Sequence, residues 1–106
     1  MIKKEIYIYI DDMRQPVNSD WIWVKTYREA INYLINLTDY LDVIDDPVDL
    51  TIDFDHDLGE EKSGYDIAKW LIENGEKGNF HIHSMNPVGA NNIRQLLKHY
   101  GWTEVF

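Results

Sequence analysis

The chain has 106 residues, of which 44% are hydrophobic and 13% are aromatic, and this length and composition fit one folded domain over residues 1–106. Its formal net charge is -9 at pH 7, so we expect no stable binding to duplex DNA and no docking on an anionic membrane. The chain has no cysteine, which excludes a disulfide framework and a thiolate zinc site. No apolar run is long enough for a membrane span, and acids follow the basic N-terminus too closely for a signal peptide, so we expect a cytoplasmic protein.

The first half of the chain predicts two strands and one helix. Residues 6–10 alternate Ile with Tyr, and because both sets are apolar enough for burial, they predict a central parallel strand. Residues 21–25 predict a second strand, and Thr26 caps a helix with Glu29 at the capping-box position. The apolar stripe of that helix comprises Ala30, Ile31, Leu34, Ile35 and Leu37. We interpret residues 39–49 as a loop or short helix end, broken at Asp46-Pro47.

The second half repeats this alternation. Residues 50–54 predict a third strand, and Ser63 caps a helix whose buried stripe comprises Ile67, Ala68, Leu71 and Ile72. Residues 80–84 predict a fourth strand. A helix opened by residues 88–92 follows and ends at Gly101, and residues 102–106 predict a short edge strand. Alternating strands and helices indicate an α/β fold with a parallel sheet.

Polar residues follow three of these strands. Asp11-Asp12 follows the first, Asp55-His56-Asp57 follows the third and His83-Ser84 ends the fourth. Right-handed crossovers bring the carboxyl ends of parallel strands to one edge of the sheet, and a flavodoxin-like order 2-1-3-4-5 makes the first and third strands neighbours. Carboxylates gathered there suit Mg²⁺, which shares its remaining positions with water and phosphate oxygens. A solvated turn is the alternative for Asp11-Asp12.

The histidines and the start of the last helix suit phosphate chemistry. His56 is a candidate acid or base, or a structural partner of its acidic neighbours, and His83 at a strand end is a better functional candidate than His81. Ser84 is placed either to donate to a phosphoryl oxygen or to cap the next turn. Asn86 and Gly89 open a helix whose N-terminus suits an anion.

These motifs resemble those of response-regulator receiver domains and, more closely, of a receiver-like family named for predicted cyclic-phosphate processing. The similarity rests on Asp11-Asp12-Met13-Arg14-Gln15-Pro16, Phe54-Asp55-His56-Asp57-Leu58-Gly59, Ser63-Gly64-Tyr65-Asp66 and His83-Ser84-Met85-Asn86-Pro87-Val88-Gly89-Ala90. It implies a flavodoxin-like, receiver-like sheet. Signalling receivers have a Lys after the fifth strand and a fifth helix. The final residues, Gly101 to Phe106, contain neither, so we expect a fold truncated at the C-terminus.

The resemblance and the motifs together predict a metal-dependent phosphoesterase or phosphate-binding domain for a cyclic phosphate of a nucleotide or RNA end. The expected metal ligands for Mg²⁺ or Mn²⁺ are Asp11, Asp12 and Asp55. The expected catalytic residues are His56, Asp57 and His83. The expected substrate-binding residues are Arg14, Ser84, Asn86 and Gly89. Two alternatives stay open: a non-enzymatic acidic protein, phage-encoded, that binds a host protein or mimics the charge of nucleic acid, and a degenerate receiver that accepts phosphate on Asp55.

Overall fold

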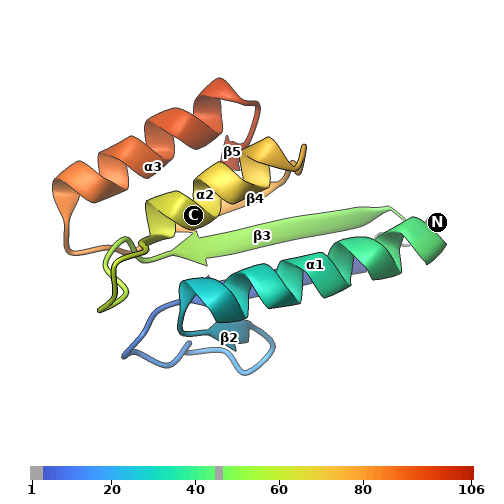
Figure 1. The fold of residues 1–106 in the computed structure, drawn as a ribbon, viewed down its shortest axis with the longest axis horizontal. Helices are drawn as coiled ribbons and strands as arrows, with labels where there is room; N and C mark the ends of the chain where they lie inside the picture. Colours follow the sequence, from blue (N-terminus) through green and yellow to red (C-terminus); the bar gives the residue numbers. More distant parts are fainter. Residues whose placement is uncertain (1–3, 45–46) are drawn as a thin grey trace.

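The computed structural model describes residues 4–44 and 47–106, which form one parallel sheet and three helices (Figure 1). The strands are β1 (Lys4–Ile10), β2 (Ile22–Val24), β3 (Val48–Phe54), β4 (Asn79–Ile82) and β5 (Thr103–Glu104). The helices are α1 (Tyr27–Ile44), α2 (Gly64–Glu73) and α3 (Pro87–His99). The strand order is β2-β1-β3-β4-β5 and every pairing is parallel, which confirms the predicted flavodoxin-like order.

All three helices lie across one side of the sheet (Figure 1). They follow β2, β3 and β4, and each crossover moves in the same direction along the sheet. Right-handed crossovers in one direction place their helices on one face. Only the connection from β1 to β2 runs in the opposite direction, and its residues 11–21 form no helix. The second face of the sheet therefore has no helical layer within the described part of the chain.

The core lies between the helices and this covered face. In β1 the isoleucines are buried, whereas Tyr7 and Tyr9 are only partly buried. The expectation that both faces of the first strand are buried is therefore wrong for the tyrosine face, because no helix among residues 4–44 and 47–106 covers it. The opposing core side chains from the helices include Ala30, Leu34, Ile67, Ala68, Leu71, Ile93 and Leu97.

Several element boundaries differ from the predictions. Helix α1 continues through Ile44, across part of the segment expected to be a loop or short helix end, and Ile35 is exposed instead of lying in the buried stripe. The final strand shortens to Thr103–Glu104, and β4 ends at Ile82. The capping box of Ser63 and Asp66 is present at the start of α2. Asp46, half of the predicted Asp46-Pro47 break, lies outside the described residues.

None of the described helices is both long and apolar enough to cross a membrane.

Candidate functional site

Three side chains converge at the carboxyl edge of the sheet. Asp11 follows β1, Asp55 follows β3 and His83 follows β4, and one ligand atom from each lies within 4.8 Å of the others. Backbone hydrogen bonds fix them there: the Asp55 N–H donates to the Ile10 carbonyl at 3.1 Å, and the His83 N–H donates to the Phe54 carbonyl at 3.0 Å. Sheet-like pairing thus continues one step beyond the strand ends and sets the positions of the three residues, which we call the edge cluster.

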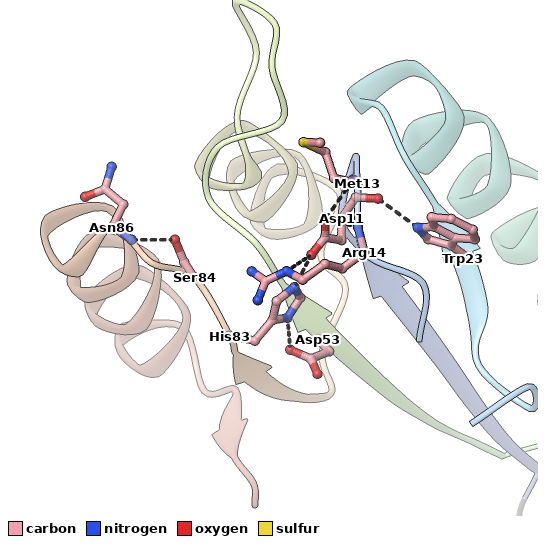
Figure 2. Close-up of polar contacts among 8 residues, drawn as sticks. All are labelled: Asp11, Met13, Arg14, Trp23, Asp53, His83, Ser84 and Asn86. Atoms are coloured by element: carbon pink, nitrogen blue, oxygen red, sulfur yellow. Dashed lines mark hydrogen bonds and ion pairs between the residues drawn. The ribbon is translucent and has the colours of Figure 1, made fainter. Parts of the chain in front are cut away.

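The Asp11 carboxylate is almost fully buried and has donors on both oxygens (Figure 2). Its Oδ1 accepts from the backbone N–H groups of Met13 and Arg14, each at 2.8 Å. Its Oδ2 lies 3.0 Å from Nε2 of His83 and 3.3 Å from Nε of Arg14. Burial alone would raise the pKa of Asp11, but these donors outweigh it, so that the pKa is lowered and the carboxylate stays ionised.

The His83 ring lies between two carboxylates (Figure 2). Its Nδ1 is 2.6 Å from Oδ1 of Asp53, and its Nε2 contacts Asp11. A neutral imidazole has one N–H, so both contacts are hydrogen bonds only in the imidazolium form. Burial lowers the pKa of His83, but the two carboxylates outweigh burial and the net shift is upward. The ring also stacks on Tyr9, with ring centroids 4.6 Å apart and planes inclined by 2°.

Asp55 is the carboxylate of the cluster whose charge is least compensated. It is 8% exposed, and burial and the charge of Asp11 raise its pKa, despite an opposing effect of the Ser84 hydroxyl and His83. Two close acids of this kind favour a cation between them. The two carboxylates are oxygen ligands that Mg²⁺ or Mn²⁺ accepts, so they fit such an ion, whereas His83 would join them as a ligand only after its Nε2 loses its proton.

Asp12 is not among the residues whose ligand atoms form the edge cluster. Its Oδ2 is close to Gly59, where an added Cβ would approach it to 2.9 Å. Gly59 has a φ of 69°, a conformation that suits glycine. The edge cluster therefore contains His83 in the position where the sequence suggested Asp12, and a role of Asp12 in metal binding stays a prediction.

A second group of side chains, which we call the helix-start group, joins the loop after β3 to the start of α3. Nδ1 of His56 lies 2.9 Å from Oδ1 of Asp57, and Nδ2 of Asn86 donates to Oδ2 of Asp57 at 3.4 Å. Oδ1 of Asn86 caps α3 by accepting from the Gly89 N–H at 2.9 Å. A Cβ at Gly89 would overlap the His56 ring, so glycine lets the ring occupy this position. The four residues thus form one contact group on a fixed helix end.

The predicted site residues therefore fall into these two groups, with Asp12 beside them. Arg14 contacts the edge cluster through Asp11, and Ser84 connects the two groups because its Oγ accepts from the Asn86 N–H at 3.0 Å (Figure 2). Sequence reasoning missed Asp53 and Tyr9, which hold the His83 ring. The available signal was strand alternation, which puts Asp53 on the face opposite to Ile52 and Phe54. The catalytic and binding roles of all these residues stay predictions.

Comparison with known proteins adds one finding. A family model described as the cyclic-phosphate processing receiver domain matches residues 6–99. The matched range includes every residue of the edge cluster and of the helix-start group. No curated protein and no solved structure matches the chain.

Proposed function

The chain belongs to the family of cyclic-phosphate processing receiver domains, and we propose that it is a metal-dependent phosphoesterase that opens a cyclic phosphate on a nucleotide or an RNA end. The observation that carries the proposal is the edge cluster, in which Asp11, Asp55 and His83 offer ligand atoms within 4.8 Å of one another. Two buried acids at the end of parallel strands are costly without a compensating cation. The carboxyl edge is also where ligands bind in open α/β sheets.

Asp11 and Asp55 would hold Mg²⁺ or Mn²⁺, together with His83 or with the neighbouring Asp12. When bound, such a cation supplies charge stabilisation at the phosphoryl oxygens and lowers the pKa of a water molecule. Asp53 and Tyr9 orient His83: Asp53 binds its Nδ1 at 2.6 Å, opposite the nitrogen that faces Asp11, and Tyr9 stacks on the face of the ring. Orientation by such an outer group typically matters for a ligand or acid–base histidine.

His56 suits proton transfer. The Nδ1–H that donates to Asp57 leaves Nε2 as an acceptor in the neutral ring. This nitrogen would take a proton from the attacking water as the new P–O bond forms. The ring P–O bond then breaks, and the proton passes to the departing ribose oxygen. Asp57 holds the tautomer that this requires.

The phosphate would meet donors from both groups. The Ser84 hydroxyl lies beside Asp55, and the guanidinium of Arg14 is 57% exposed, so it has the freedom to turn from Asp11 to a phosphate. The Gly89 N–H already donates to Oδ1 of Asn86, so a phosphate oxygen would take this N–H only by replacing that cap. The positive end of the α3 dipole favours an anion there.

The test is calorimetric titration of Mg²⁺ and Mn²⁺ into the wild type and Asp55→Asn, followed by incubation with 2′,3′-cyclic nucleotides. The matched control is Asp39→Asn, which removes the same charge from an exposed position of α1. We expect binding and ring opening in the wild type and in the control, with both lost in Asp55→Asn. Unchanged binding and hydrolysis in Asp55→Asn would refute the proposal. Labelling of Asp55 by acetyl phosphate would favour the phosphoacceptor alternative instead.

A further inference from the structure

A cavity of about 300 Å³ lies on the sheet face that none of the described helices covers. Its lining includes the rings of Tyr9, Trp21, His81 and Phe106, together with the carboxylate of Asp53. The aromatic rings contact one another: Trp21 lies 6.5 Å from Tyr9 and 6.3 Å from Phe106, measured between ring centroids. Ligand pockets of about this volume are typically apolar and aromatic with a few polar groups.

The cavity adjoins the edge cluster through two of its own residues. Tyr9 lines the cavity and stacks on His83, and Asp53 lines the cavity and contacts the same ring. The His83 ring therefore lies between the edge cluster and the cavity, so a ligand with its phosphate at the edge cluster can extend into the cavity.

Two neighbouring polar groups of the cavity, on Asp53 and His81, are acceptors, and the amide nitrogen of Asn18 is a donor elsewhere in the lining. Oδ1 of Asp53 is occupied by His83, which leaves Oδ2 to accept. Nδ1 of His81 lies 3.2 Å from the Val105 carbonyl oxygen, which can only accept, so this nitrogen is the donor and Nε2 of a neutral ring is left to accept. A ring ligand with N–H donors at its edge satisfies both acceptors.

We propose that this cavity binds the nucleobase of the cyclic-phosphate substrate, and that bases with an exocyclic amino group bind better than uracil. The inference rests on the proposed function for the phosphate end of the ligand. Flat bases stack on aromatic side chains in proteins that bind unpaired nucleotides. A second copy of the chain is a less suitable occupant, because two molecules of net charge -9 repel each other.

The experiment compares three ligands: 2′,3′-cyclic AMP, 2′,3′-cyclic UMP and the base-free analogue 1-O-methylribose 2,3-cyclic phosphate. Dissociation constants in Mg²⁺ are measured for the wild type, Trp21→Leu and Phe106→Ala. The control is Tyr100→Leu, which removes an aromatic ring that is 48% exposed at the end of α3. Phe106 is 83% exposed, so its variant keeps the test valid even if Trp21→Leu fails to fold.

We expect the cyclic nucleotide with adenine to bind more tightly than the one with uracil. Both cavity variants should weaken binding of cyclic AMP by about tenfold, the effect of losing one base–aromatic stack, while the base-free analogue is unaffected. Equal loss for the base-free analogue, or equal binding of all three ligands, would overturn the inference. A dimer that sedimentation detects in the wild type and that Trp21→Leu abolishes would also overturn it.

Adenosine, which has no phosphate, separates this inference from the proposed function. Adenosine that shifts the NMR signals of Trp21 and His81, without hydrolysis of any cyclic nucleotide, would support the base cavity and refute the phosphoesterase. Hydrolysis that is equally fast with and without a base would support the phosphoesterase and refute the base cavity.

Discussion

Replacing Gly89 with Ala separates the position of the His56 ring from the stability of the fold. A Cβ at residue 89 would lie 2.5 Å from Cδ2 and 2.6 Å from Nδ1 of His56, whereas ordinary van der Waals contact begins at 3.4 Å. Cγ of His56 would lie closer still, so the ring must retreat by about 1 Å or more from the helix start. Gly89 lies in the first turn of α3, where Ala is favoured over Gly by up to about 1 kcal/mol, so the helix itself is not weakened.

A displacement of about 1 Å at a catalytic group costs on the order of 100-fold in rate. We therefore expect Gly89→Ala to fold, while losing about 100-fold in cyclic-phosphate hydrolysis. The assay pairs a thermal melt with kcat/KM and with the imidazole NMR signals of His56. Val88→Ala is the matched control, because Val88 is 71% exposed and adjacent. Full activity in Gly89→Ala, with shifted His56 signals, would refute the role of His56 in proton transfer.

Three further predictions concern stability. The pKa of His83 is raised in the folded protein, so protonation of His83 stabilises the metal-free protein. This stabilisation is complete below the unfolded pKa, about 6.5, and is lost as the pH rises through the folded pKa. Urea titrations in EDTA should show the decline of the unfolding free energy, and Asp53→Asn should flatten it. Burial and the charge of Asp42 raise the pKa of Glu76, so the ionised side chain destabilises the fold. Glu76→Gln should therefore increase the unfolding free energy at pH 7 and lose this advantage below pH 4, where Glu76 is protonated in both states. Melts of both proteins at the two pH values would check this. Phe80→Ala should cost about 3–5 kcal/mol in urea unfolding, since the ring is fully buried in β4, between β3 and β5.

The fold was predictable because local and long-range signals agree. Alternating apolar residues marked the strands, and the Ser63–Asp66 capping box marked the start of α2. The parallel arrangement then placed Asp11 and Asp55 together, since both follow neighbouring strands. The convergence of the acids is therefore a consequence of topology, which alternating strands and helices specify.

The details of the site depend on side-chain directions, which the sequence specifies poorly. Asp11 and Asp12 are adjacent, yet the turn whose backbone N–H groups bind Asp11 leaves Asp12 beside Gly59. In the sequence, Asp53 is an ordinary polar residue on the outer face of a strand, and its contact with His83 becomes evident only in the structure. The partly buried tyrosines of β1 resemble core residues, because nothing in their spacing shows that one face of the sheet lacks helices.

The lengths of the strands also bear on how the protein avoids self-association. The two long strands, β1 and β3, have seven residues each and lie inside the sheet, whereas the edge strands β2 and β5 have three and two. An edge strand exposes unpaired N–H and C=O groups that another chain can pair with, and a short one offers few of them. The two longest strands are thus paired along both of their edges, and the short edge strands leave little backbone for another chain to pair with.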